Sequence, residues 1–547
     1  MNRSALLLLC FALACGGGHP PAVDGGPSPS RVPLLLAPWD GEGTGSVWAN
    51  QTGPLAPGPL TPEFRWTAVE GAAQYEFEID DSCASPGDCG FPSPALHFST
   101  PDTSFTPANP LDVEMTPPVG RRYYWHVRAC GTKGCDDWSP ISYVDVGRQI
   151  QDFNGDGYAD VVVAVPTAAP VTAGGPSLGG ALVYFGGPDL PASPGWTLPA
   201  DPGNSIWWVR WIGDVDGDGF GDLAVIEGGH GYIDRVRVYK GGNSPVADAA
   251  IELTQPSWSV SAVMGGMDLN GDGFVDVVVS YRLSGMANVG VLPGGASLAQ
   301  SMLTPPVAFA LVDACDWNAD DLGDLILQSP DGIDVLSGSA SAPLGGQMQS
   351  VAVGSGYEAI GCVRNFSGRG GASLLLLYAG NPGDAAALTM ISGPAVLPSN
   401  GCDAPLPQVG GGVGPYAASS YPAVAHPGDV DRDGFDDAVL GDAPNNRAIL
   451  FFGGCPPQRA LVLPGAMSGS FTPVAGYAVG AIGDINGDGF PDLAVGNPYE
   501  GTDGFGVGEV YLYLGGSNPR ATPDALLRSP VNTPTPGTVD GFGASVD

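Results

Sequence analysis

Aspartate and asparagine recur along the chain in a nine-residue pattern whose oxygens could bind a hard metal cation. Asp or Asn occupies positions 1, 3 and 5, glycine occupies position 6, and Asp occupies position 9. The intact copies are DFNGDGYAD (152–160), DVDGDGFGD (214–222), DLNGDGFVD (268–276), DVDRDGFDD (429–437) and DINGDGFPD (484–492). A tight loop turns such alternate side chains towards its centre, and Gly at position 6 takes the sharp bend. Hard oxygen ligands suit Ca²⁺, so the pattern predicts calcium-binding loops.

The predicted ligands are the side chains at positions 1, 3, 5 and 9 and the backbone carbonyl at position 7. The side-chain ligands are Asp152, Asn154, Asp156, Asp160, Asp214, Asp216, Asp218, Asp222, Asp268, Asn270, Asp272, Asp276, Asp429, Asp431, Asp433, Asp437, Asp484, Asn486, Asp488 and Asp492. The carbonyl ligands are those of Tyr158, Phe220, Phe274, Phe435 and Phe490. Without a cation, carboxylates about 5 Å apart would repel each other by about 3 kcal/mol per pair. We therefore expect the ions to be part of the fold.

Two further copies of the pattern are altered. The copy at 316–324 (DWNADDLGD) has Ala319 and Asp321 in place of glycines. It retains the candidate ligands Asp316, Asn318, Asp320 and Asp324. The copy at 365–373 (NFSGRGGAS) has Arg369 at position 5 and serine at position 9, which cannot form a cation cage. We expect five Ca²⁺ sites, a weaker sixth at 316–324, and the Arg369 guanidinium in the metal's place in the other copy.

An EF-hand is the alternative explanation of these loops. An EF-hand requires a bidentate Glu at position 12, inside a helix. Position 12 is instead occupied by Val163, Val225, Val279, Leu440 and Val495. These residues stand in apolar runs such as VVVAVP, which are typical of buried strands. The EF-hand alternative is therefore rejected.

The spacing of the loops indicates the elements that must position them. The seven copies start at residues 152, 214, 268, 316, 365, 429 and 484, which leaves room for four short strands per repeat. Runs such as ALVYFGG, RVRVYKGG and EVYLYLGG close the repeats with a strand and paired glycines. The 85 Gly and 54 Pro residues also disfavour long helices. The sequence thus predicts an all-β fold in which residues 148–547 form a seven-bladed β-propeller.

These repeats resemble the FG-GAP repeat of integrin alpha-subunit propellers and their bacterial relatives. The ends of that motif are legible in GDAP (441–444), GNP (496–498) and FGASVD (542–547). The resemblance implies that the calcium loops join the first and second strands of each blade on one face. It also implies that partners bind the opposite face. We expect FGASVD to pair with the first blade and close the ring; the alternative is a fragment of a longer protein or a frayed tail.

The N-terminal segment carries signals for export. Residues 5–14 form an apolar stretch that is too short to span a bilayer but fits a secretion signal. The sequence Ala12-Leu13-Ala14-Cys15 resembles a bacterial lipobox, which implies cleavage before Cys15 and acylation of that residue. Residues 16–31 are rich in Gly, Pro and Ser and predict a flexible linker. We expect an extracytoplasmic protein held by its N-terminal lipid at the outer membrane or cell surface.

Residues 32–147 contain no calcium loop and predict a separate β-sandwich. FRWTAVEGAAQYEFEID and YYWHVRA alternate apolar and polar residues and are rich in strand-forming aromatics. These segments resemble a fibronectin type III domain. We expect Trp66 and Tyr75 to anchor its core, with the strand 124–127 opposite them.

The cysteines predict disulfide bonds. Without Cys10 and Cys15, which fall in the export signal, an even number remains for an oxidising compartment. The candidate pairs are Cys83 with Cys89, Cys130 with Cys135, Cys315 with Cys362, and Cys402 with Cys455. Metal binding by these thiols is the alternative, but the chain has no CxxC motif.

The sequence favours binding over catalysis. No recognisable catalytic constellation appears, and the histidines, His230 and His426 among them, are interpreted as structural. Trp207, Trp208, Trp211, Trp258, Tyr357, Tyr416, Tyr421 and Tyr477 either fill the wedges between blades or form a ring for carbohydrate or peptide. The net charge of −37 opposes binding to nucleic acid or anionic lipid. We expect an adhesion or ligand-binding module with an unknown protein or carbohydrate ligand; the alternative is an extracytoplasmic hydrolase or lyase on a propeller scaffold.

Overall fold

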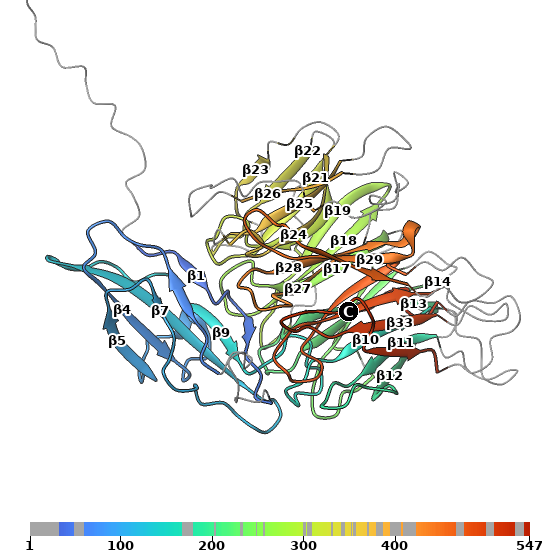
Figure 1. Ribbon diagram of the computed structural model, residues 1–547, viewed down its shortest axis with the longest axis horizontal. Helices are drawn as coiled ribbons and strands as arrows, with labels where there is room; N and C mark the ends of the chain where they lie inside the picture. The colour runs from blue at the N-terminus through green and yellow to red at the C-terminus, as the bar shows by residue number, and fades with distance from the viewer. Residues whose placement is uncertain are drawn as a thin grey trace, which may run out of the picture.

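The structure is a computed structural model of the chain, and its strands form two regions (Figure 1). It describes residues 32–48, 60–166, 179–201, 204–229, 234–247, 249–254, 258–298, 302–303, 309–329, 332–340, 345–351, 353, 357–368, 371–378, 387–393, 406–407, 423–465, 475–498, 508–530 and 541–547. Within these ranges the only helices are the short 3₁₀ turns η1 (Pro86–Asp88) and η2 (Ala443–Asn445). The prediction of an all-β fold is confirmed.

The N-terminal region is a sandwich of two sheets. One sheet has the order β1 (Leu35–Ala37), β3 (Phe64–Trp66) and β6 (Ser104–Phe105). The other has the order β2 (Glu42–Thr44), β9 (Ser142–Val146), β7 (Arg121–Gly131), β4 (Gln74–Asp80) and β5 (Leu96–Thr100), with β8 (Gly134–Cys135) paired to β7. On β4, the alternate residues Tyr75, Phe77 and Ile79 are buried, which is the period expected of a strand with one face on a core.

Both expected core anchors of the sandwich are buried. Trp66 and Tyr75 are 2% and 4% exposed, and their rings pack edge to face at 5.8 Å. Trp66 belongs to β3 in the smaller sheet, so the segment 124–127 on β7 lies opposite it as expected. Tyr75 belongs to β4, which pairs directly with β7, so that part of the expectation was wrong.

The described residues after 148 form seven small antiparallel sheets. In chain order they are β10 (Val161–Val165), β11 (Gly180–Tyr184), β12 (Trp196–Pro199); β13 (Asn204–Gly213), β14 (Asp222–Gly229), β15 (Arg235–Tyr239), β16 (Ile251–Thr254); β17 (Trp258–Met267), β18 (Asp276–Leu283), β19 (Met286–Leu292); β20 (Ala310–Cys315), β21 (Asp324–Ser329), β22 (Gly332–Leu336), β23 (Met348–Val351); β24 (Tyr357–Val363), β25 (Ser373–Tyr378), β26 (Ala387–Ser392); β27 (Val424–Gly428), β28 (Asp437–Asp442), β29 (Arg447–Phe451), β30 (Ala460–Pro464); and β31 (Ala478–Gly483), β32 (Asp492–Asn497), β33 (Glu509–Tyr513), β34 (Ala525–Arg528).

Each small sheet packs its two faces against different neighbours. On β10, Val161, Val163 and Val165 join a core shared with the last sheet. Val162 and Ala164 point the other way, into a core shared with the second sheet. A strand covered on both faces is apolar throughout, which explains the run VVVAV.

The chain's last described segment pairs with the first sheet, as predicted. Val546 forms an antiparallel bridge with Val163, and the Val162 N–H donates to the Asp547 carbonyl at 2.8 Å. The Ala159 N–H donates to the Asp484 carbonyl at 3.0 Å, which joins the loops of the first and last sheets. The edge of β10 is thereby covered.

Three predicted disulfides are confirmed. Cys83 bonds to Cys89, Cys130 to Cys135 and Cys315 to Cys362. The last of these joins β20 to β24, the first strands of neighbouring sheets. Cys455 is also disulfide-bonded, whereas its expected partner Cys402 lies outside the described residues.

Several predictions fall outside the described residues. They concern Cys15, the linker 16–31, Arg369, His230, Tyr416 and Tyr421. A search of the described residues finds no helix with the length and apolar character needed to cross a membrane.

Candidate metal centres

From the second small sheet onward, each acidic loop connects the first strand of a sheet to the second, whereas the loop at 152–160 leads from the sandwich into β10. The position-1 Asp organises the loop. The Asp152 carboxylate accepts the N–H groups of Asp156 at 3.1 Å and Gly157 at 2.7 Å. Asp484 does the same with Asp488 at 3.0 Å and Gly489 at 2.7 Å. These bonds fold the backbone of positions 5 and 6 around the carboxylate, as alternating acidic residues in a tight loop should.

The position-9 Asp has a structural role that the sequence did not reveal. The Asp160 carboxylate accepts the Phe153 N–H and the Gly186 N–H, each at 2.9 Å. The same two bonds, to position 2 and to the glycine after the third strand, recur at Asp222, Asp276, Asp324, Asp437 and Asp492. Each position-9 Asp therefore ties its loop to its own sheet. Its role as a metal ligand stays a prediction.

Position 4 connects neighbouring loops. Gly155 has a φ of +72°, and a Cβ there would lie 2.3 Å from the ring of Phe220, at position 7 of the next loop. Equivalent contacts join Gly217 to Phe274, Gly271 to Leu322, Gly368 to Phe435, Gly487 to Tyr158, Gly371 to Ala319, and Arg432 to Phe490. The contacts pass from each loop to the next and return from the last loop to the first. The loops thus form one continuous layer.

The two loops with Asp rather than Asn at position 3 contain compact carboxylate clusters. Oxygens of Asp214, Asp216 and Asp218 lie within 4.8 Å of one another, as do oxygens of Asp429, Asp431 and Asp437. The structure therefore brings together three of the four predicted side-chain ligands in each of these two loops. An oxygen-only donor set of this kind suits Ca²⁺.

Of the buried side-chain oxygens that lack a hydrogen-bond partner in the described residues, two belong to position 3 of a loop. They are Asp431 Oδ1 and Asn318 Oδ1. The Asp431 side chain is 3% exposed, so its unpaired oxygen is costly unless a ligand outside the protein satisfies it. This observation is what a cation-binding loop would produce.

Burial raises the pKa values of several position-1 carboxyls in the loops. Burial, then the charge of Asp156, raises the pKa of Asp152 to about 7. Burial also raises the pKa of Asp484 to about 7 and that of Asp316 to about 8, with nearby carboxylates as the second cause in each. The ionised forms are thus destabilised in the protein alone, and a divalent cation would offset that cost.

The altered copy at 316–324 keeps the backbone conformation of the intact loops at its two substituted glycine positions. At 316–324, Ala319 and Asp321 take φ values of +60° and +67°, the conformation that glycine adopts in intact loops. In the copy at 365–373, Ser373 replaces the position-9 Asp, and its hydroxyl pairs with that of Ser367 at 3.4 Å. At 316–324 the positive-φ conformation therefore persists without glycine.

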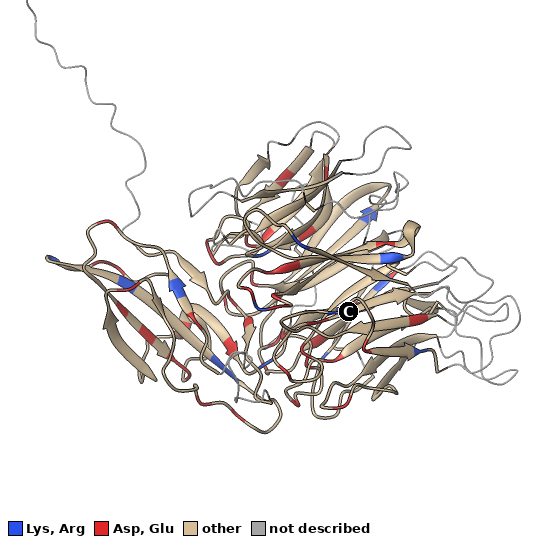
Figure 2. Cartoon of the chain, viewed as in Figure 1, with Lys and Arg blue, Asp and Glu red and all other residues tan. Residues whose placement is uncertain are grey.

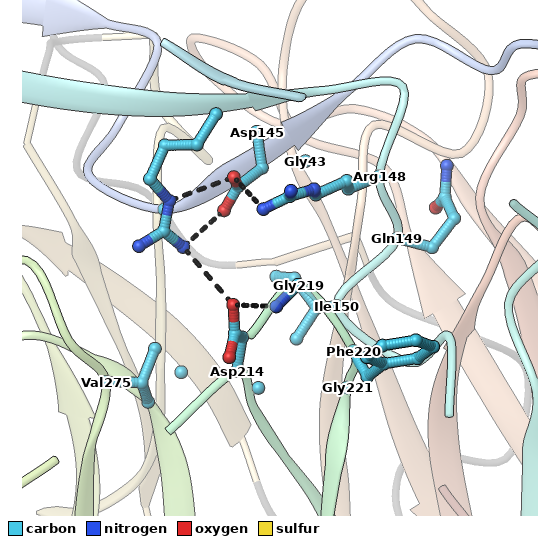
Figure 3. A pocket seen from close by; sticks show the side chains of 14 residues that line it. Gly43, Asp145, Arg148, Gln149, Ile150, Asp214, Gly219, Phe220, Gly221 and Val275 are labelled. Carbon is cyan, nitrogen blue, oxygen red and sulfur yellow. Dashed lines mark hydrogen bonds and ion pairs between the residues drawn. The ribbon is translucent and has the colours of Figure 1, made fainter. Parts of the chain in front are cut away.

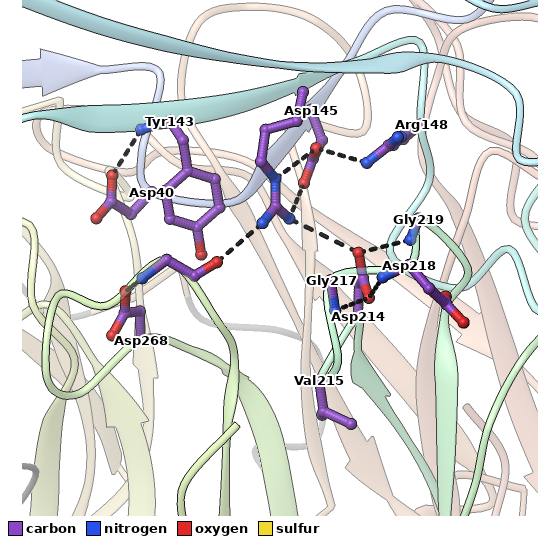
Figure 4. Close-up of polar contacts among 12 residues, drawn as sticks. Asp40, Tyr143, Asp145, Arg148, Asp214, Val215, Gly217, Asp218, Gly219 and Asp268 are labelled. Atoms are coloured by element: carbon purple, nitrogen blue, oxygen red, sulfur yellow. Dashed lines mark hydrogen bonds and ion pairs between the residues drawn. The ribbon is translucent and has the colours of Figure 1, made fainter. Parts of the chain in front are cut away.

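The sandwich lies on the loops. Arg122 donates to the Gly273 carbonyl at 2.9 Å, and its Nη2 is 2.7 Å from Asp145 Oδ2 and 3.9 Å from Asp214 Oδ2 (Figure 4). A small cavity of about 30 Å³ lies here between the two regions (Figure 3). Figure 2 shows acidic segments where the sandwich meets the small sheets.

Other contacts extend this interface to the first and last loops. Trp48 stacks on Tyr158 with ring centroids 5.4 Å apart, and its Nε1 donates to the Asp156 carbonyl at 3.0 Å. Ser46 Oγ donates to the Gly487 carbonyl at 3.4 Å. These residues could not be found from the sequence, because each follows the pattern of an ordinary sandwich residue and its role depends on contact between the two regions.

The histidines and aromatics occupy several environments. His426 pairs with Asp313 at 2.8 Å across Gly361, and the same Asp313 oxygen accepts the Cys362 N–H at 2.8 Å. Trp211 and Trp258 are buried as wedge-filling residues. Trp207, Trp208 and Tyr477 are instead 46%, 36% and 47% exposed.

Comparisons with known proteins agree with this architecture. The FG-GAP repeat family matches residues 152–184 and 475–513. Integrin alpha-PS2 of Drosophila melanogaster is 34% identical over 116 residues, which is 18% of this chain and 8% of that protein. Human integrin alpha-6 is 34% identical over 97 residues, again 8% of its length. The chain therefore spans under a tenth of the length of these curated relatives.

Solved structures give a weaker likeness. An auxiliary nutrient binding protein from Bacteroides thetaiotaomicron VPI-5482 aligns over 86% of this chain and 99% of its own, with 11% identity and a TM-score of 0.32. The repeat matches and the integrin alpha likeness, together with the small antiparallel sheets, support an FG-GAP β-propeller.

Proposed function

We propose that the chain is a calcium-stabilised propeller of seven blades (148–547) that serves as a ligand-binding or adhesion module. The recurring loop, with oxygens at positions 1, 3 and 5 turned inward, carries this proposal. Calcium would be held by the acidic residues of the five intact loops and, more weakly, by the copy at 316–324. Its contribution is structural, since a bound divalent charge offsets the repulsion and burial of the carboxylates.

The proposed assembly has an N-terminal support. Residues 32–147 would be a fibronectin type III-like domain, joined through the linker 16–31 to a lipid on Cys15. This arrangement places the propeller outside the cytoplasm, at the outer membrane or cell surface. The three disulfides are consistent with an oxidising compartment.

The proposed ligand is a protein or a carbohydrate. Exposed Trp207 and Trp208 on β13, with Tyr477, support such a role because large rings exposed to solvent are common in binding surfaces. The loop side of the propeller is covered by the sandwich at several loops, which leaves the opposite side for partners.

A hydrolase or lyase is the less favoured function. His426 beside Asp313 is the one described His–Asp pair outside the loops, and it joins β27 to β20. Asp313 also accepts backbone N–H groups from Cys362 and Ala314. The Asp313 carboxylate is thus held by backbone groups of neighbouring strands, as a structural link requires, whereas His426 Nδ1 is buried without a hydrogen-bond partner among the described residues.

Calcium removal tests the proposal. We expect chelation with EDTA to lower the thermal midpoint of the whole chain, because each site at about tenfold excess over its Kd contributes about 1.4 kcal/mol. Equilibrium dialysis should find about five Ca²⁺ per chain. A chain that retains no calcium and melts identically with and without EDTA would refute the proposal.

A further inference from the structure

The intact loops divide into two classes by the residue at position 3. Three loops have Asn there, whereas the loops at 214–222 and 429–437 have Asp. The second class therefore carries four ligand carboxylates instead of three. An extra carboxylate would strengthen the mutual repulsion unless another charge balanced it.

In the Asn loops the position-3 amide donates a hydrogen bond to the position-5 carboxylate. Asn154 Nδ2 donates to Asp156 Oδ2 at 2.9 Å. The same bond measures 3.0 Å from Asn270 to Asp272 and from Asn486 to Asp488. Because an ionised Asp has no proton to donate, the two Asp loops cannot form this bond.

In both Asp loops a basic residue supplies the counter-charge, and it pairs with the position-3 carboxylate. Lys240 Nζ pairs with Asp216 Oδ2, and Arg459 Nη1 lies 2.5 Å from Asp431 Oδ2. Both cations come from the connection between the third and fourth strands of the same sheet, after β15 and before β30. The side chains of Asp216 and Asp431 are 6% and 3% exposed, whereas those of Lys240 and Arg459 are 38% and 52% exposed, so solvent partly screens each pair.

The pairing is specific to these two sheets. The corresponding connection of the last sheet, whose loop has Asn486, also contains an arginine. That residue, Arg520, pairs with Asp524 near its own strand. In the loop at 429–437, Arg432 is directed away to the Phe490 ring at 5.2 Å, which leaves Arg459 as the partner of Asp431.

We propose that Lys240 and Arg459 set the charge of the two Asp loops and thereby tune their affinity for calcium to that of the Asn loops. This inference rests on the proposed calcium binding. Each cation pairs with one position-3 oxygen. Asp431 Oδ1 is the unpaired oxygen noted above, whereas Asp216 Oδ1 accepts the Asp218 N–H at 3.3 Å and would have to bind the metal alongside it. Affinity in oxygen-ligand loops follows the number of charged ligands, so an unbalanced fourth carboxylate would bind calcium more tightly.

Charge removal and charge repair test this proposal in the full chain. Lys240→Met should lower the thermal midpoint in EDTA, because Asp216 loses its counter-charge. The same substitution should tighten one calcium site about tenfold in a calcium titration, because charge count sets affinity. Arg459→Met should do the same at the other loop, and Arg520→Met, the matched control, should change neither measurement.

A second substitution that restores the charge of the loop distinguishes an effect of charge from an effect of packing. In the Lys240→Met background, Asp216→Asn recreates the Asn-loop pattern and should restore both the midpoint in EDTA and the wild-type affinity. A Lys240→Met protein with unchanged calcium affinity, or one that Asp216→Asn fails to restore, would overturn the inference. Both tests require that the wild-type chain bind calcium. If the wild-type chain binds no calcium, the proposed function is refuted rather than this inference.

Discussion

At the residue scale, position 4 of each loop is constrained by the residue at position 7 of the next loop. Gly155 needs its positive φ and also leaves room for the ring of Phe220. Between the loops at 316–324 and 365–373 the larger side chain is at position 4 and the glycine is at position 7, since Ala319 faces Gly371. The two positions therefore belong to one contact between repeats.

Gly155→Ala should destabilise the protein by about 2 kcal/mol, because a backbone with positive φ and a crowded Cβ are both unfavourable. A double-mutant cycle with Phe220→Ala measures the contact. Phe220→Ala should cost less in the Gly155→Ala protein than in wild type, since the smaller side chain relieves the crowding. Additive effects on the free energy of unfolding would contradict the contact.

The sequence predicted positions 1, 3, 5, 6 and 9 from the chemistry of one loop, but it could not predict position 4. The reason is physical: the residue that fills the space over Gly155 belongs to the following repeat. Lys240 and Arg459 were missed for a related reason. Each stands far along the chain from the carboxylate that it neutralises, and its side chain resembles any surface cation in the sequence.

At the element scale, the segment 541–547 completes the first sheet. Phe542 is fully buried, and the Asp547 side chain accepts the Trp211 N–H at 3.0 Å. The segment thus joins β10 on one side and β13 on the other. The sequence predicted this pairing because FGASVD repeats the start of a blade, whereas the bonds to β13 depend on packing that no single repeat encodes.

Deletion of residues 541–547 should strongly lower the thermal midpoint and promote self-association, because the edge of β10 becomes exposed. Differential scanning fluorimetry and light scattering measure the two effects. A synthetic peptide of the deleted sequence, added in excess, should raise the midpoint again if strand pairing is the cause. An unchanged midpoint after deletion would show that the segment does not hold the sheets together.

At the scale of the whole molecule, the sandwich is more than a spacer. Its residues contact the first, second, third and last loops through Trp48, Arg122 and Ser46. The sequence could predict the two regions separately, since each has its own strand pattern. It could not predict their contact, because Arg122 on β7 follows the alternation of any half-exposed strand.

Arg122→Met should loosen the sandwich from the loops. Arg122 is 12% exposed at its side chain, and its loss removes the cation that Asp145 and Asp214 share, although Asp145 keeps Arg148 at 3.3 Å. Hydrogen exchange should therefore rise at 214–222 and 268–276. Arg128→Met removes a more exposed arginine of the same strand, paired with Glu76, and should leave those loops protected. Equal protection in both variants would mean that the sandwich is held by its apolar contacts, whereas selective loss makes Arg122 the electrostatic link between the sandwich and the acidic loops.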